Sequence, residues 1–194
     1  MRLAALCLLA SVVLPSVSRA QEVPVFAITR AESSITFKVK ASVAIQGTFD
    51  QWDATLTFTS PDVTTGVLDV KIQAATVDTG SGLKDRTLKG EDFFDVDQNP
   101  LITFTSTKIV QSGPNTFEVD GNFTIRGVTK PEKLTLAVSG KGTGSGVING
   151  TMAFDRKDYG MNSGIPFIKI ANRVEVTVSL TGSRVSGPPL VFKQ

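Results

Sequence analysis

The segment FDRKDYGMN, residues 154–162, brings a cation, an acid and a phenol together in Arg156, Asp158 and Tyr159. An arginine and a carboxylate two residues apart could hold a substrate or move a proton. Acid–base and nucleophilic catalysis mostly employ His or Cys, and this sequence has no His and only Cys7, inside its N-terminal apolar run. We therefore expect no catalytic residues. Arg156 and Asp158 are expected to organise a turn, with Tyr159 closing part of one end of the fold.

A second concentration of charge, RGVTKPE at residues 126–132, lies between two runs of alternating apolar and polar residues. Its glycine tolerates the backbone angles of a tight connection, and its proline restricts the preceding lysine to extended geometry, as at the start of a strand. We interpret the segment as a hairpin turn in which Arg126 and Lys130 are solvated charges, partly neutralised by Glu132. The alternative is that one of the two cations meets a phosphate group.

The first twenty residues have the pattern of a secretory signal peptide. Arg2 gives a cationic start, an apolar run follows from Leu3 to Leu14, and Ser18-Arg19-Ala20 matches the small-x-small cleavage rule. The run is shorter than the roughly 20 apolar residues that span a bilayer. We therefore expect residues 1–20 to be removed on export and residues 21–194 to form one domain. A leader without a cysteine framework favours export to a bacterial periplasm, with full secretion as the alternative.

The charge of the chain is balanced once the leader is removed. Lys and Arg number 20 and Asp and Glu 18 in the full sequence, and Arg2 and Arg19 lie in the leader, which leaves 18 against 18. Nucleic-acid binding normally requires a basic stripe and a positive balance. We therefore expect no nucleic-acid partner and no stable membrane insertion. Without His, and without Cys after the leader, we expect neither a metal site nor a cofactor.

Apolar and polar residues alternate with a period of two through most of the remaining chain, as in half-buried strands. Turn residues separate these runs, for example SGPN at 112–115. SGKGTGSG at 139–146 is expected to be a flexible turn, because a phosphate-binding loop would be followed by a helix and here a strand pattern follows. About eight antiparallel strands predict an all-β fold. Periodicity alone allows either a closed β-barrel or a two-sheet sandwich.

Residues 81–100, SGLKDRTLKGEDFFDVDQNP, break the β pattern and have helical spacing. Ser81 can act as an N-cap, and Gly90 divides the segment. We therefore predict a short helical insert of two helices that caps one end of a barrel. Phe93 and Phe94 are expected to pack within this cap, to reach the interior, or to do both.

Several motifs together resemble the YceI-like family of secreted, lipocalin-like proteins. They are DRTLKGEDFFDVDQNPLITFTS at 85–106, VDGNFTIRGVTKPEKLTL at 119–136, FAITRAESSITFKVK at 26–40, FDRKDYGMN and RVEVTVSLTG at 173–182. The resemblance implies a lipocalin-like antiparallel β-barrel with a helical cap. It also implies a long apolar ligand in the barrel lumen, such as a polyisoprenoid, an isoprenoid quinone or a fatty-acid derivative. A homodimer is expected from family analogy only.

On this basis we assign candidate ligand contacts. Arg86, Arg156 and Tyr159 are candidate contacts for a ligand head group. The candidate lumen residues are Phe37, Val39, Phe49, Trp52, Phe58, Val70, Ile72, Phe93, Phe94, Phe104, Phe123, Met152 and Phe154.

Two other functions stay open alongside the binding, transport or sequestration of a lipid. A barrel filled by its own side chains would suit an interaction module, for example a partner of a membrane redox protein. An enzyme acting on lipids would have to use carboxylates such as Asp85, Asp95 or Asp158. The C-terminal segment RVSGPPLVFKQ, with its apolar Leu190, Val191 and Phe192, is expected to dock either on the barrel or on a partner.

Overall fold

The computed structural model describes residues 22–42, 44–164 and 169–193, and the expected signal peptide lies outside the described residues. Within these ranges the chain forms eleven β-strands, one α-helix and four short 3-10 helices. The helices are α1 (Gly82–Lys89), η1 (Arg30–Glu32), η2 (Val63–Thr65), η3 (Ala74–Thr76) and η4 (Arg156–Tyr159). The strands are β1 (Val25–Ile28), β2 (Ser34–Ala41), β3 (Ile45–Phe49), β4 (Trp52–Thr57), β5 (Val67–Gln73), β6 (Val77–Asp78), β7 (Leu101–Gln111), β8 (Thr116–Ile125), β9 (Val128–Val138), β10 (Ser145–Asp155) and β11 (Ile170–Ser186).

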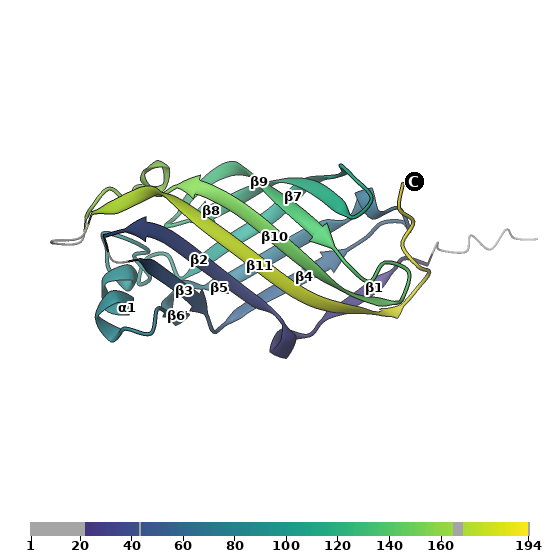
Figure 1. The fold of residues 1–194 in the computed structure, drawn as a ribbon, viewed down its shortest axis with the longest axis horizontal. Coiled ribbons are helices and arrows are strands. Elements are labelled where there is room, and N and C mark those ends of the chain that lie inside the picture. The colour runs from purple at the N-terminus through teal and green to yellow at the C-terminus, as the bar shows by residue number, and fades with distance from the viewer. Residues whose placement is uncertain (1–21, 43, 165–168, 194) are drawn as a thin grey trace, which may run out of the picture.

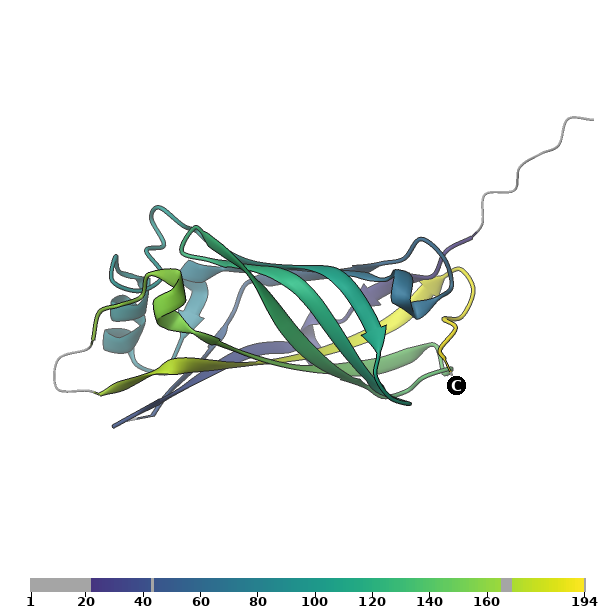
Figure 2. The ribbon, with the colours of Figure 1, turned by 90° about the horizontal axis from the view of Figure 1, so that it is seen from above.

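All of these strands belong to one antiparallel sheet, ordered β4-β5-β7-β8-β9-β10-β11-β2-β3-β6, with β1 paired to β11. The sheet curls along a long axis (Figures 1 and 2). A single curled sheet rules out the two-sheet sandwich that periodicity had left open. Among the described helices, none has the length and apolar character needed to cross a membrane.

The strand count differs from the predicted eight because two long strands are interrupted. Residues 50–51 separate β3 from β4, and η3 separates β5 from β6. The hydrogen bonds from Asp50 N to Thr76 O (3.2 Å) and from Gln73 N to Gln51 O (2.9 Å) continue the pairing across both interruptions. The short β1 is the remaining addition. The all-β, antiparallel prediction is confirmed, and the number of strands was underestimated.

The alternating pattern places apolar side chains inside the curl and polar ones outside. On β2, Ile35, Phe37 and Val39 are buried while Lys38 and Lys40 are exposed. Burial of each large apolar side chain contributes about 1.5–3 kcal/mol to folding. The inner face of the curl therefore holds the core, and any internal cavity is lined mainly by apolar groups.

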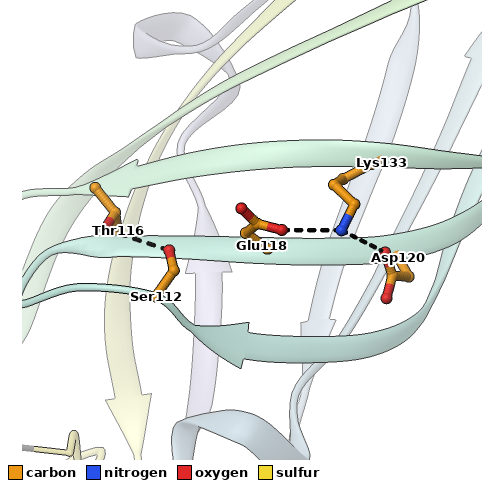
Figure 3. A network of polar contacts seen from close by, with 5 residues as sticks. All are labelled: Ser112, Thr116, Glu118, Asp120 and Lys133. Atoms are coloured by element: carbon orange, nitrogen blue, oxygen red, sulfur yellow. Dashed lines mark hydrogen bonds and ion pairs between the residues drawn. The ribbon is translucent and has the colours of Figure 1, made fainter.

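The outer face carries solvent-exposed charge networks (Figure 3). Lys133 Nζ on β9 lies 2.9 Å from Glu118 Oε2 and 3.3 Å from Asp120 Oδ1, both on β8. Beside them, Ser112 Oγ bonds Thr116 Oγ1 across the predicted SGPN hairpin, which indeed joins β7 to β8. Exposed ion pairs of this kind add little stability.

The insert after β6 caps one end of the curled sheet, but only its first half is helical (Figure 1). Gly90 ends α1, and residues 91–98 form turns, so the second predicted helix is wrong. The reason lies in Phe93 and Phe94, which are adjacent in sequence and both buried. A helix would direct them about 100° apart, whereas turns held by Phe93 N to Gly90 O and Phe94 N to Leu88 O bury both.

Ser81 stands at the N-cap position of α1 without a side-chain capping bond. The start of the helix is instead tied down by Asp85, whose Oδ1 accepts from Thr79 N (2.9 Å) and Thr79 Oγ1 (2.6 Å). These bonds, the hydroxyl bond above all, lower the pKa of Asp85 below its ordinary value. Asp85 is thus engaged with Thr79, and no ion pair with Arg86 is formed in the described structure.

The RGVTKPE segment is a hairpin turn, as predicted, but only Arg126 and Gly127 form its bend. Both have positive φ, 53° and 70°, as in a type I′ turn. Pro131 lies inside β9 and not at its start. It is tolerated there because β9 pairs with β10 only at residues 135–138, which leaves this stretch of β9 with β8 alone as a partner.

Candidate functional site

The inside of the curled sheet contains two cavities at opposite ends of its long axis. The first, which we call the strap cavity, is about 130 Å³ and lies at the end where the chain terminates (Figure 1). It is covered by residues 187–193, which we call the strap. Besides the strap, the glycine-rich turn and Arg184, its walls are mainly apolar side chains, including Phe26, Ile28, Leu56, Phe58, Leu68, Ile109, Phe117, Leu136 and Ile148.

The second cavity, the cap cavity, is about 70 Å³ and lies under α1 and the turns that follow it. Aliphatic side chains and phenylalanine rings form its walls. Phe37 contacts Phe49 and Phe94, with ring centroids 5.6 and 6.4 Å apart, and Phe123 contacts Phe154 at 5.1 Å. One charged residue, Arg156, lines it within the described part of the chain.

A belt of packed side chains, which we call the waist, separates the two cavities. On β5, Leu68 lines the strap cavity and Ile72 the cap cavity, while Val70 between them lines neither. Phe104 occupies the same level on β7, since it pairs with Val70. Gly121 makes room for it, because a Cβ there would stand 2.4 Å from Phe104 Cζ. The waist includes Val70, Phe104, Met152 and Val178, which are buried and line neither cavity.

All of the predicted lumen residues are buried, but they are distributed over these regions. Phe58 lines the strap cavity, and Trp52 lines neither cavity and packs beneath the guanidinium of Arg30, 5.4 Å from its ring. Val70, Phe104 and Met152 belong to the waist. The cap cavity is lined by Phe37, Val39, Phe49, Ile72, Phe93, Phe94, Phe123 and Phe154. That these residues bind a ligand stays a prediction.

Of the three residues predicted to meet a head group, Arg156 and Tyr159 are engaged by other groups of the protein, and Arg86 lies away from both cavities. Arg156 is 6% exposed, and its guanidinium donates to Ala171 O, Ser163 O and Met161 O. These backbone bonds make Arg156 a support for the loop after η4. Arg86, on α1, is exposed and lines neither cavity.

Tyr159 is fully buried and closes the cap end, as predicted, without lining a cavity. Its ring makes edge contacts with Phe154 and Phe123, at 5.2 and 5.5 Å, and its hydroxyl donates to Glu132 Oε1 at 2.8 Å. Burial, supplemented by the Glu132 carboxylate, raises the pKa of Tyr159 far above its ordinary value. The phenol is therefore held neutral and bonded, and it is not free for a head group.

The structure corrects the prediction that Arg126 and Lys130 of RGVTKPE are solvated and partly neutralised by Glu132. Arg126 is half-buried and donates to Gly160 O and Glu91 O, which ties the hairpin to η4 and to the cap. Glu132 accepts from Tyr159 and does not neutralise a neighbouring cation, while Lys130 pairs loosely with Asp158 at 3.6 Å. These side chains span the interval where β9 and β10 are not hydrogen-bonded, so they hold the sheet together there.

The strap resolves the alternatives for the C-terminal segment, because it docks on the sheet. Val191 N donates to Pro61 O (2.8 Å) and Val63 N donates to Val191 O (3.1 Å). Gln111 binds both backbone groups of Lys193, and Phe192 packs on Phe117 with centroids 6.2 Å apart. Among the predicted lumen residues, Phe58 alone lines the strap cavity. Phe117 could have been assigned to the lumen from the sequence, since it has the same place in the alternation of β8 as Phe123. The position of the strap could not, because no sequence pattern indicates where residues 187–193 dock.

Comparison with known proteins places the chain in a family. A model of the YceI-like domain matches residues 26–182. A UPF0312 protein of Pseudomonas syringae pv. syringae is 33% identical over 122 residues, which cover 60% of this chain and 64% of the relative. A UPF0312 protein of Azotobacter vinelandii is 27% identical over 146 residues, covering 72% and 74% of the two chains. The match to the Pseudomonas relative thus spans less than two thirds of its length.

Solved structures share the fold at low identity. Burkholderia cenocepacia BcnA superposes with a TM-score of 0.72 at 23% identity, covering 80% of this chain and 99% of that one. A polyisoprenoid binding domain from Saccharophagus degradans gives 0.67 at 15% identity, covering 83% and 99%. The family match over residues 26–182 agrees with the motifs found in the sequence, and the chain belongs to the YceI-like family.

Proposed function

We propose that this protein binds a long apolar lipid chain inside the curled sheet and carries or sequesters it in the bacterial periplasm. The observation that carries the proposal is the pair of apolar cavities placed end to end along one lumen. We assign the ligand to polyisoprenoids, isoprenoid quinones or fatty-acid derivatives. The periplasmic location rests on the leader, residues 1–20.

The volumes of the two cavities determine which side chains a long lipid tail must displace in order to bind. A dry apolar cavity of about 150 Å³ accepts a molecule the size of benzene, so the strap cavity alone suits only a short part of a chain. A longer tail has to displace the waist, above all the ring of Phe104. Burial of ten methylene-sized groups would contribute roughly 8 kcal/mol before the costs of ordering, which is enough to drive such repacking.

A binding protein is favoured over an enzyme by the positions of the carboxylates. Asp85 is bonded to Thr79, Asp95 accepts from Asn99 Nδ2 at 3.1 Å, and Asp158 faces Lys130. None of the three lines either cavity in the described structure. The polyisoprenoid binding domain of Saccharophagus degradans, which shares this fold, gives further support.

We further propose that the curl is a closed, lipocalin-like barrel, with the bonds from Asp50 to Thr76 and from Gln73 to Gln51 joining its two ends. Closure would leave no free sheet edge and would isolate the lumen from water. A homodimer stays a prediction.

The test is to introduce a larger side chain at a residue that lines one cavity, so that the cavity is filled. Ile148 on β10 lines the strap cavity, and the adjacent Asn149 points to the exposed outer face. Ile148→Trp is expected to reduce the affinity for a fluorescent fatty acid or a quinone at least tenfold, about 1.4 kcal/mol, whereas Asn149→Trp leaves it unchanged. Equal affinities in both variants, with unchanged melting temperatures, would contradict the proposal. If no lipid probe binds the wild type, an interaction module becomes the better account.

A further inference from the structure

Two cations, Lys141 and Arg184, line the mouth of the otherwise apolar strap cavity. Lys141 belongs to the glycine-rich turn between β9 and β10, and Arg184 lies near the end of β11. The backbone N–H of Arg184 donates to Gly144 O at 2.7 Å, which fixes the turn beside the strand. Lys141 and Arg184, 43 positions apart in sequence, are thus brought to one rim.

Both side chains are half-buried and neither pairs with a carboxylate among the described residues. Lys141 Nζ donates to Pro114 O and stands 4.8 Å from the centre of the Phe192 ring, in a cation–π contact with the strap. The guanidinium of Arg184 donates to Gly187 O through one nitrogen. Because arginine carries five N–H donors and lysine three, most of their donors remain available.

The other charges at this end do not neutralise the pair. Two carboxylates lie near the strap among the described residues. Asp62 is bridged to Val191, and its Oδ1 already accepts from Thr64 N (2.8 Å) and Thr64 Oγ1 (2.7 Å). Its charge is also close enough to Lys193 for a favourable interaction. Glu22, next to the Val23 that packs on Gly187, is exposed and forms no ion pair among the described residues. The rim therefore carries an excess of positive charge next to an apolar cavity. Arg156 at the cap cavity differs, because its Nε and Nη1 already donate to three backbone carbonyls.

We infer that Lys141 and Arg184 form a binding site for the oxyanion head group, carboxylate or phosphate, of a lipid whose tail enters the strap cavity. The inference rests on the proposed lipid binding and adds the charge and the orientation of the ligand. The guanidinium fork suits two oxygens of the anion, and the ammonium adds a third, charge-assisted bond. Binding would draw Lys141 away from Phe192 and so loosen one contact of the strap.

The test compares ligands that share a tail and differ in the head. Oleic acid is paired with oleyl alcohol, and farnesyl phosphate with farnesol, in calorimetric titrations at low and high ionic strength. Lys141→Gln combined with Arg184→Gln is expected to weaken binding of the two anions about tenfold or more. The alcohols should be unaffected. Lys38→Gln, an exposed lysine on the outside of β2, is the matched control and should change neither.

The outcomes distinguish a failure of the head-group site from a failure of the proposed lipid binding. Loss for one anion alone identifies whether the site takes a carboxylate or a phosphate. Equal losses for acid and alcohol, or unchanged binding of both anions, overturn the head-group site while leaving lipid binding intact. Failure of the wild type to bind any of the four ligands overturns the proposed function itself. Lys141→Gln alone, which spares the Arg184 bond to Gly187, covers the case in which the double variant does not fold.

Discussion

The strap end and the cap end of the lumen both combine aromatic walls with an arginine, yet the two arginines have different partners. Arg156 at the cap end is buried and donates to three backbone carbonyls, whereas Arg184 at the strap end is half-exposed and holds one. A cation beside a cavity is available to a ligand only if its donors are not already used by the fold. The comparison therefore gives Arg156 a structural role and leaves Arg184 available for the proposed head-group site.

Substitution of the two arginines should reveal the largest difference between the two ends. Arg156→Gln leaves buried carbonyls unpaired and is expected to lower the free energy of unfolding by about 3 kcal/mol, while Arg184→Gln costs about 1 kcal/mol or less. Denaturant unfolding of both variants measures the difference. Similar losses for the two would show that Arg184 is also structural, and would weaken the case for a head-group site.

The waist between the two ends gives the next largest effect. Gly121→Ala places a methyl group 2.4 Å from Phe104 Cζ and 2.8 Å from Thr105 O, so the ring and the strand must shift. We expect a loss of about 1–3 kcal/mol in unfolding free energy. Gly82→Ala, where a Cβ meets nothing within 4 Å, is the control and should not destabilise the protein. A Gly121→Ala variant as stable as the wild type would mean that the waist is loosely packed.

The cap end can be probed through Tyr159, the single tyrosine of the sequence. Its raised pKa means that the folded state favours the neutral phenol. The contribution of Tyr159 to the free energy of unfolding is fully present below a pH of about 10, the pKa of tyrosine in the unfolded chain. It falls as the pH rises above that value, by up to about 1.4 kcal/mol per pH unit. Tyrosinate absorbance should therefore appear only on unfolding, and the stability of Tyr159→Phe should depend less on pH above that value. Ordinary titration of the folded protein near pH 10 would contradict the buried, bonded phenol.

The outer face should give the smallest effect. Lys133 pairs with Glu118 and Asp120, but all three side chains are about half exposed (Figure 3). Lys133→Ala is expected to change the unfolding free energy by less than about 1 kcal/mol and ligand affinity not at all. A thermal melt at low and high salt checks this, and a larger change would mean that the network stabilises the lumen from outside.

The period of two in the sequence was sufficient to predict the all-β fold and the buried positions, because alternation directly reports which side chains point inward. Phe37 and Val39 on β2 are examples. The hairpins at 112–115 and 126–127 followed from turn chemistry, and the family motifs identified the domain. The second helix failed because the burial of Phe93 and Phe94 together overrode helical spacing.

The sequence did not predict which charged side chains are free to contact a ligand. Whether an arginine is free depends on long-range hydrogen bonds, such as Arg126 to Gly160 or Arg156 to Ala171, which no local pattern encodes. Lys141 lies in a glycine-rich turn that looked like a plain connection, and it reaches a cavity only because the strap and β11 fold beside it. The division of the lumen by the waist likewise depends on packing across strands.

The most direct test of lipid binding in the lumen is native mass spectrometry of the mature protein, expressed with its own leader, purified without detergent, and followed by extraction of any bound mass. Our account predicts a stoichiometric isoprenoid or acyl species in the wild type that is depleted in Ile148→Trp and retained in Asn149→Trp. A wild-type protein that carries nothing, and takes up no quinone, prenyl phosphate or fatty acid, would contradict it.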